Sequence, residues 1–318
     1  MQKGKPGNLK KAVIFFILLF LCGCNIKKEA TDDFFAMDTF MTVKLTGTEE
    51  DVTAVREEIY RADNLFKKDK ISLSDRETAD LAKLAYDISV ETDGAFDITV
   101  SPLCDLWGFW NNSFRVPEKS EIEETLEFTG FESMTFSENE IILPQGFSID
   151  FGAIAKGYAG KTAAELLKKR GITSAILSLG GNIQTVGNAP DGEKWCVGIK
   201  NPFGEEGYSG FVYVSDKAVV TSGGYERNFE SEGIKYQHII NPETGAPAET
   251  DIASVTVIAE NGAVADALST AFFVMGAEKT EKYCYEKGFK TADTVFSVVI
   301  IKENGEKIIL GDTDWRKA

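Results

Sequence analysis

Histidine is almost missing from this chain, because His238 is the only one among 318 residues. A zinc site built from several imidazoles is therefore excluded, and a hydrolase of the Ser-His-Asp type would have to use this one side chain. Basic residues are also few, since 34 Lys and Arg stand against 50 Asp and Glu and give a formal net charge of −16. Contacts to phosphate backbones depend on Lys and Arg, so we expect no nucleic acid among the partners. Sites made of hard oxygen ligands, or cofactor chemistry, are the classes that remain.

The N-terminus carries an apolar run, residues 12–21, which follows four lysines. About ten residues are too few to span a bilayer and are typical of a secretory signal. The run ends in Leu21-Cys22-Gly23-Cys24, which resembles the bacterial lipobox, so we predict cleavage after Gly23 and lipidation of Cys24. Residues 1–23 are then a signal peptide and residues 24–33 a lipidated tether; a buried cysteine pair is the alternative. Lipid on Cys24 would anchor the protein to a membrane on the extracytoplasmic side, at the cell surface or in the periplasm.

Cysteine is scarce in the remainder of the chain, where Cys104, Cys196 and Cys284 are widely spaced and odd in number. This pattern is typical of neither a zinc motif nor a disulfide framework. We predict packed free thiols, and one disulfide between two of the three is the alternative.

No linker, repeat or charge block divides residues 34–310, so we predict one domain, followed by a tail over residues 311–318. Apolar alternation predicts a strand over residues 41–46, and Thr48 then caps a helix that buries Val52, Val55 and Ile59. Further elements follow from caps, periodicity and turn signals: a helix opened by a capping box at Ser74 and ended by Asp93-Gly94, a helix from about Gly157 to Arg170, a strand from Ala175 to Leu179, a helix over 263–276, and a hairpin of strands 296–302 and 307–310 around Asn304-Gly305. Because helices and strands alternate without a regular rhythm, the fold class is α+β.

The helix over 263–276 is apolar except for Asp266, Ser269 and Thr270. An unpaired buried carboxylate is costly, and residues at i, i+3 and i+4 share one face of a helix. Three converging oxygens suit a hard cation such as Mg²⁺ or Ca²⁺. The alternative is structural, with Asp266 capping a neighbouring loop and the hydroxyls bonding back to their own helix carbonyls. Spacing alone leaves both readings open.

A second cluster of small and charged residues runs from Ser148 to Tyr158, at the entry to a helix. Gly152, Ala153 and Ala155 allow close approach of the backbone, and such a turn presents carbonyls to a cation or amides to a phosphate. Asp150 and Lys156 add opposite charges, and the alternative is a tight turn with a surface ion pair. Neither of the common glycine-rich nucleotide motifs occurs.

Together, these segments resemble the ApbE family of flavin transferases, bacterial lipoproteins that move FMN from FAD onto a protein threonine or serine. The resemblance is carried by blocks that occur in the same order along most of the chain: Met37 to Thr39, Asp93 to Leu103, Leu106 to Phe109, Asp150 to Tyr158, Ser178 to Asn182, Thr221 to Arg227, His238 to Gly245, and Asp266 to Thr270. It implies a single ApbE-like domain related to the T-fold, which can divide into two lobes with the flavin and metal site between them.

The resemblance also assigns site residues. It implies that a divalent cation, Mg²⁺, is held by the backbone carbonyl of Ala153 and by the side chains of Asp266, Ser269 and Thr270. It places contacts to FAD on Met37, Ala95, Phe96, Asp97, Asp150, Lys156 and Ile240. Asp150 and His238 are the candidates for a catalytic base, and a packed, structural imidazole is the alternative for His238.

One departure from the family concerns the segment after Phe66. Family members usually continue there with a Ser-x-Tyr and Ser-Glu-Ile-Ser-like stretch that contacts the flavin and closes one wall of its pocket. Here the chain passes from Leu65 almost directly into the next helix. The pocket is then more open, or its wall comes from elsewhere, with Trp107, Phe109, Trp110 and Asn111-Asn112 as candidates.

The implied activity is Mg²⁺-dependent transfer of FMN from FAD, the substrate, to a Ser/Thr hydroxyl of an exported acceptor protein, with release of AMP. Two alternatives share the same site. With water as the nucleophile the protein is an FAD pyrophosphatase that yields FMN and AMP, and without turnover it is an FAD-binding lipoprotein.

Overall fold

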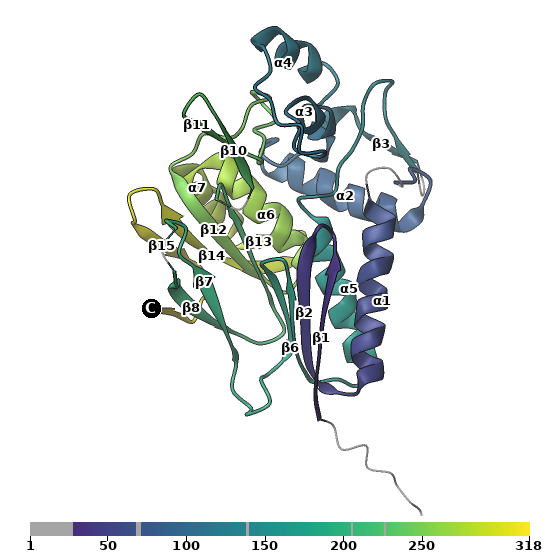
Figure 1. The fold of residues 1–318 in the computed structure, drawn as a ribbon, viewed down its shortest axis with the longest axis vertical. Helices are drawn as coiled ribbons and strands as arrows, with labels where there is room; N and C mark the ends of the chain where they lie inside the picture. The colour runs from purple at the N-terminus through teal and green to yellow at the C-terminus, as the bar shows by residue number, and fades with distance from the viewer. Residues whose placement is uncertain (1–27, 68–70, 138–139, 205, 226) are drawn as a thin grey trace, which may run out of the picture.

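The computed structural model describes residues 28–67, 71–137, 140–204, 206–225 and 227–318 (Figure 1). Its helices are α1 Glu49–Phe66, α2 Arg76–Glu91, α3 Ser101–Leu106, α4 Lys119–Leu126, α5 Ala155–Lys169, α6 Gly262–Met275 and α7 Ala277–Lys287. The strands are β1 Lys28–Ala36, β2 Thr39–Gly47, β3 Thr135–Ser137, β4 Glu140–Ile142, β5 Ser174–Leu179, β6 Asn182–Gly187, β7 Trp195–Lys200, β8 Tyr208–Val214, β9 Ala218–Gly223, β10 Asn228–Ser231, β11 Ile234–Gln237, β12 Ile252–Ala259, β13 Lys290–Thr291, β14 Thr294–Lys302, β15 Lys307–Leu310 and β16 Trp315–Lys317.

A nine-stranded antiparallel sheet forms the centre of the fold, in the order β1-β2-β5-β6-β9-β12-β14-β13, with β15 also paired to β14. Its longest hairpin is β1–β2, in which all nine residues of β1 face a partner on β2. The turn places Met37 and Asp38 at φ 47° and 57°, in the left-handed region that a two-residue hairpin turn with the sheet's own twist requires. Met37 and Lys28 therefore lie at opposite ends of β1.

Helices cover one face of the sheet, with α1, α5 and α6 lying side by side against it (Figure 1). Their apolar stripes meet the inward-facing residues of the strands and form two buried clusters, one against β1, β2 and β5 and one against β9, β12 and β14. α6 is buried almost all round, which explains why its sequence is apolar on every side. The other face of the sheet is covered by a small sheet of order β16-β8-β7, and Trp195, Val212 and Ile258 pack between the two sheets.

The predicted helix starts were right for α1 and wrong for α2. Thr48 caps α1 and forms a capping box with Asp51. The cap of α2 is Asp75, not Ser74, because the Asp75 carboxylate accepts the N–H of Thr78 at 2.8 Å. α5 begins at Ala155, two residues before the predicted start, α6 runs to Met275, and the β14–β15 hairpin around Asn304-Gly305 forms as predicted.

Both ends of the described chain are strands where the sequence suggested extensions. The predicted tether over residues 24–33 overlaps β1 from Lys28 onward, and the predicted tail over 311–318 contains β16, which pairs with β8. Ala30, Phe34 and Ala36 point into the core, so alternation exists in β1 but is masked by the charged residues between them. Cys104, Cys196 and Cys284 form no disulfide, as predicted. Cys104 and Cys284 are buried, whereas Cys196 is exposed, so the prediction that all three are packed was wrong for Cys196.

Candidate functional site

The crossing of α5 and α6 is the tightest backbone contact near the predicted site. A Cβ added to Gly157 would lie 2.1 Å from the carbonyl oxygen of Gly262, and one added to Gly262 would lie 2.4 Å from the carbonyl oxygen of Gly157. Only glycine at both positions allows the two helices to approach this closely. The predicted small-residue segment therefore serves helix contact directly, and it brings the first turn of α5 against Asp266.

Asp266 is a buried carboxylate, with 5% of its surface exposed. Its Oδ2 accepts the N–H of Gly157 at 2.8 Å. Burial raises the pKa of this carboxyl, and the charge of Lys156, the Gly157 N–H and the side chain of Asn182 offset part of that rise. A buried carboxylate whose charged form is this costly is stabilised by a cation placed beside it.

The two hydroxyls of the predicted metal set differ in their surroundings. Ser269 Oγ donates to the carbonyl oxygen of Asp266 at 2.8 Å and lies 2.8 Å from Ser222 Oγ. Because the single Ser269 proton goes to that carbonyl, Ser222 is the donor to Ser269, and one lone pair of Ser269 Oγ remains. Thr270 is half-buried one turn after Asp266. The contacts of the structural alternative are thus present, and they still leave oxygen lone pairs for a cation.

This donor set fits a hard cation and does not fit a soft one. Within the described part of the chain, no three His, Cys, Asp or Glu side chains are grouped so that they could hold a metal ion. A cation at this place would depend on one carboxylate together with hydroxyl and carbonyl oxygens, which is the chemistry Mg²⁺ accepts when a substrate phosphate supplies further oxygens. Ala153, whose carbonyl completes the predicted set, is half-buried in the turn just before α5.

Asp150 starts the turn that leads into α5. Its Oδ1 accepts the N–H of Gly152 at 2.9 Å, and its own N–H donates to the carbonyl of Ile98 at 2.8 Å. A Cβ on Gly152 would lie 3.3 Å from the indole of Trp110. The structure therefore joins three predicted regions here: the 150–158 segment, the 95–98 segment and Trp110.

Two of the predicted FAD contacts in the 95–97 segment have structural duties. Asp97 Oδ1 accepts from the N–H and the hydroxyl of Thr99, both at 2.7 Å, and Oδ2 accepts from the N–H of Phe131 at 2.9 Å. Burial raises the pKa of the Asp97 carboxyl, and these hydrogen bonds oppose the rise. The Phe96 side chain is 1% exposed and packs in the core, while Ala95 is half-buried. Backbone atoms, rather than the Asp97 and Phe96 side chains, are what this segment offers a ligand.

His238 is oriented by the backbone. Its Nδ1 lies 3.1 Å from the carbonyl oxygen of Arg227, so Nδ1 carries the proton and Nε2 carries the lone pair. Burial lowers the pKa of the imidazole to about 4, and the charges of Lys156 and Arg227 act in the same direction while the Arg227 carbonyl opposes them. The ring is therefore neutral at neutral pH. The charge of Lys156 acts on both His238 and Asp266.

An aromatic cluster lies next to Trp110. Its members are Trp107, Phe109, Phe114, Phe229 and Tyr236, with ring centroids 5.2 to 6.5 Å apart. Phe229 and Tyr236 belong to the β10–β11 hairpin, which the sequence did not predict. The Trp107 indole N–H donates to the carbonyl of Gly245 at 2.9 Å, and Arg227 donates to Asn112 at 3.2 Å. Two of the candidates for the missing wall, Trp107 and Phe109, lie inside this cluster.

The remaining predicted contacts lie at the edges of these groups. Ile240 is buried beside Trp107 and Phe109, and it forms an isolated bridge with Pro247. Met37 is half-buried in the β1–β2 turn and packs against both helix-side clusters. Thr39 lies against Gly180, whose added Cβ would meet the Thr39 side chain at 2.4 Å, so the hairpin turn contacts the Gly180-Gly181 turn.

Sequence reasoning did not assign Asn182, Ser222 or Arg227, which support Asp266, Ser269 and His238 respectively. Each lies in a block that carried the family resemblance, Ser178 to Asn182 or Thr221 to Arg227. A polar residue next to paired glycines was the available signal. The contact itself depends on sheet pairing that the sequence does not display.

The fold and this site define an α+β protein in which a buried carboxylate at a helix crossing accepts a backbone N–H and feels the charge of a lysine. Residues 30–292 match the ApbE family, so the chain belongs to that family, and the predicted membership and single mixed domain are confirmed.

Three relatives illustrate the similarity. The FAD:protein FMN transferase of Treponema pallidum is 36% identical over 223 residues, which cover 65% of this chain and 62% of the relative. The crystal structure of the ApbE protein of Thermotoga maritima has a TM-score of 0.80 at 32% identity and covers 89% of this chain and 97% of that one. The apo flavinyl transferase ApbE of Pseudomonas stutzeri has a TM-score of 0.75 at 26% identity, with coverages of 89% and 94%. In sequence, the chain spans about 62% of the length of the transferases it matches.

Proposed function

We propose that this protein transfers FMN from FAD to a Ser/Thr hydroxyl of an exported acceptor protein and releases AMP, with Mg²⁺ as the metal. One observation carries the proposal: in a chain of the ApbE family, the buried Asp266 carboxylate lies against the Gly157 N–H and close to Lys156. Relatives in this family are named FAD:protein FMN transferases. A buried anion next to amide and ammonium donors suits a cation that in turn binds a pyrophosphate.

The metal would be held by the Ala153 carbonyl and by Asp266, Ser269 and Thr270. When bound, Mg²⁺ neutralises charge that develops on the pyrophosphate of FAD. Lys156 supplies a further positive charge at the same end, on the first turn of α5, where the helix dipole is also positive. These groups hold and polarise the bond between the FMN and AMP halves.

The nucleophile is the acceptor hydroxyl, which must lose its proton as its oxygen attacks the phosphorus of FMN and AMP departs. His238 suits this step because its Nδ1–H is fixed on the Arg227 carbonyl and Nε2 is free of its proton at neutral pH. Asp150 is the second candidate, with one oxygen engaged by the Gly152 N–H. FAD contacts are proposed for Met37, Ala95, Phe96, Asp97, Asp150, Lys156 and Ile240, through backbone atoms for Phe96 and Asp97.

The test is incubation of the chain from residue 24 onward with FAD, Mg²⁺ and candidate exported proteins. Flavin fluorescence in a denaturing gel and an AMP assay are read together. Labelled acceptor with stoichiometric AMP is the expected result. AMP with free FMN would instead identify a pyrophosphatase. If neither labelled acceptor nor AMP forms, the protein binds FAD without turnover.

We further propose that the precursor is cleaved after Gly23 and lipidated on Cys24, so that the protein is a membrane-anchored lipoprotein on the extracytoplasmic side. These positions lie outside the described residues, and the support is the lipobox-like sequence. No helix among the described residues is long and apolar enough to cross a membrane. Cys24→Ser is expected to move the protein from the membrane to the aqueous fraction, with Cys196→Ser as the control; retention of Cys24→Ser in the membrane would contradict lipidation.

A further inference from the structure

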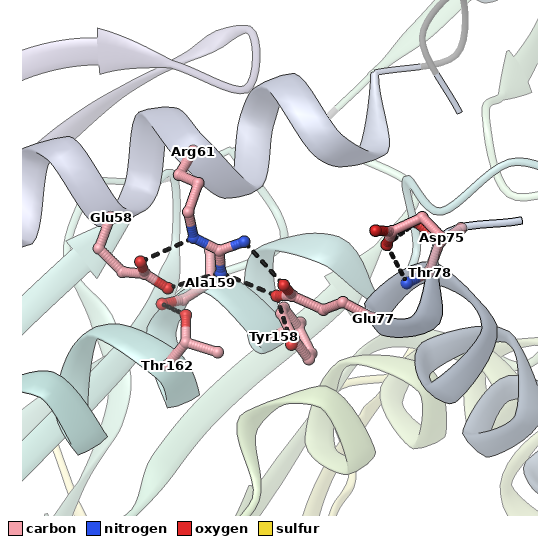
Figure 2. A network of polar contacts seen from close by, with 8 residues as sticks. All are labelled: Glu58, Arg61, Asp75, Glu77, Thr78, Tyr158, Ala159 and Thr162. Atoms are coloured by element: carbon pink, nitrogen blue, oxygen red, sulfur yellow. Dashed lines mark hydrogen bonds and ion pairs between the residues drawn. The ribbon is translucent and has the colours of Figure 1, made fainter. Parts of the chain in front are cut away.

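A polar network joins three helices near the end of α1 and the start of α2. Arg61 of α1 donates two hydrogen bonds to the Glu77 carboxylate of α2, both at 2.8 Å, and two to Glu58, both at 2.9 Å. The Tyr158 hydroxyl of α5 donates to Glu77 Oε1 at 2.6 Å. Figure 2 shows Glu77 reaching Arg61 and Tyr158 from the first turn of α2. We call Glu58, Arg61, Glu77 and Tyr158 the Glu77 network.

Tyr158 is held on its ring as well as on its hydroxyl. The ring meets Phe66, the last residue of α1, edge to face at 5.2 Å, and Phe66 meets the buried Phe151 at 5.1 Å. Burial and the Glu77 carboxylate raise the pKa of the Tyr158 phenol, so it stays a hydrogen-bond donor across the neutral range. Both ends of the turn from Phe151 to Tyr158 are thereby fixed to α1.

This turn leads directly to Asp266. The Tyr158 N–H closes the first turn of α5 on the Ile154 carbonyl at 3.0 Å, and the preceding N–H, that of Gly157, donates to Asp266. Because α5 and α6 touch backbone to backbone at Gly157 and Gly262, no flexible side chain lies between them to absorb a displacement. A movement of Tyr158 is therefore passed to the Gly157–Asp266 bond.

We propose that Tyr158 is a positioning residue: the Glu77 network holds its phenol so that the first turn of α5 keeps Gly157 and Ala153 in place around Asp266. The inference rests on the proposed function in assigning a cation to this end of the site. The same network ties α2 to α1 and α5.

The other end of α2 provides a matched comparison. Glu91 accepts from the Tyr283 hydroxyl at 3.3 Å and from Thr291 at 3.1 Å, and it pairs with Lys287 at 3.5 Å. It combines the same kinds of group, a carboxylate, a buried phenol and a cation, but its partners lie on α7 and β13. Tyr283→Phe therefore removes a similar phenol without touching α5.

The decisive measurement is hydrogen exchange at the Gly157 amide. In the chain from residue 24 onward, a lysine precedes a glycine only at Lys156-Gly157 and Lys287-Gly288. Labelling lysine carbonyls with ¹³C and glycine nitrogens with ¹⁵N therefore isolates two amides by NMR. The Gly157 amide lies next to Tyr158, and the Gly288 amide lies next to Lys287, a partner of Glu91. The second readout is the affinity for Mg²⁺, measured by calorimetry without FAD and then with FAD. Thermal unfolding shows whether each variant is folded.

Tyr158→Phe is expected to speed exchange at Gly157 by about tenfold, the effect of one lost hydrogen bond, and to weaken Mg²⁺ binding by a similar factor. Tyr283→Phe is expected to lower the unfolding temperature comparably and to leave Gly157 exchange and Mg²⁺ binding unchanged. Glu77→Gln keeps an acceptor for the phenol and is expected to fall between Tyr158→Phe and the wild type. Equal Gly157 exchange and equal Mg²⁺ binding in Tyr158→Phe and the wild type would overturn the proposal. If the wild type binds no Mg²⁺, the metal assignment fails, and Gly157 exchange alone still decides the role of Tyr158.

Discussion

The α5–α6 end of the candidate site is held by backbone, whereas the end at the aromatic cluster is held by side chains. At the first, Gly157 and Gly262 touch directly and Asp266 is buried. At the second, Phe114 is 37% exposed and stacks on Phe229 in a short hairpin. Backbone contact cannot adjust to a substitution, while ring contacts lose one partner at a time. We therefore expect changes at the first end to abolish function and changes at the second to weaken it.

The largest effect is expected from Asp266→Asn. The amide oxygen still accepts the Gly157 N–H, but the negative charge for the cation is lost, so FMN transfer should fall by about a thousandfold or more. The free energy of unfolding without metal should be equal or higher, because a costly buried charge is gone. Transfer rates and urea unfolding check both halves. A near-normal rate with normal Mg²⁺ dependence would show that this carboxylate is only structural.

Gly157→Ala tests the backbone contact itself. Its Cβ would meet the Gly262 carbonyl at 2.1 Å, so α5 must move, and we expect a loss of about 3 kcal/mol in the free energy of unfolding. Gly160→Ala is the matched control on the same helix, because its Cβ would meet only the side chains of Leu179 and Gln184, at 3.2 and 3.3 Å. There the gain in helix propensity, about 1 kcal/mol, offsets the crowding. Equal losses in the free energy of unfolding would show that the backbone contact between Gly157 and Gly262 does not limit substitution more than an ordinary helix position does.

A smaller, pH-dependent effect is expected at His238, which lies between the two ends. Its pKa is about 4 in the fold and near 6.5 in the unfolded chain, so the unfolded state binds more protons between these values. Stability contributed by the neutral ring is full above pH 6.5 and is lost as the pH falls toward 4, by about 3 kcal/mol. His238→Asn keeps a donor for the Arg227 carbonyl and does not titrate. Urea unfolding of both proteins from pH 7 to pH 4 should show the extra loss only with the histidine.

The smallest effect is expected at the aromatic cluster. Phe114→Leu removes one stacked ring, worth roughly 0.5 to 1.5 kcal/mol, so FAD affinity should fall by about tenfold at most. Tyr285→Leu removes an exposed aromatic that meets only Phe289 on another side of the molecule and serves as the control. Fluorescence titration with FAD in the presence of Mg²⁺ measures the change, and iodide quenching of bound flavin reports exposure of its ring. A loss of FAD affinity far above tenfold would contradict the prediction that the aromatic cluster matters less than Asp266.

Much of the helix layer could be predicted from the sequence, because its signals are local. Thr48 and the acidic first turn fixed the start of α1, and Asn304-Gly305 predicted its hairpin. β1 was missed because Lys28 and Asp32 are compatible with a tether, and only pairing with β2 makes them a strand. β16 depends on pairing with β8, which lies far earlier in the chain. The β10–β11 hairpin is local, but none of its residues is fully buried, so it shows no clear apolar alternation.

The site was predictable in its residue types and not in its bonds. The spacing of Asp266, Ser269 and Thr270 predicted that they share one face of a helix, and all three lie on α6. Spacing could not show that Ser269 gives its proton to the Asp266 carbonyl, or that both Asp97 oxygens are engaged by Thr99 and Phe131. Those bonds follow from burial, since a polar group removed from water takes whichever partner the fold brings near.

The length of β1 also determines how far its Met37 end lies from its Lys28 end. Nine residues of extended chain span about 30 Å, comparable to the hydrocarbon thickness of a bilayer. Lys28 is the end of β1 nearer Cys24 in the chain, and the opposite end leads into Met37, a predicted FAD contact. In a protein anchored at Cys24, β1 would work as a rigid spacer that keeps the reacting groups well above the lipid headgroups. The acceptor hydroxyl would then have to be presented at that height, on a segment that projects from the membrane surface by a similar distance.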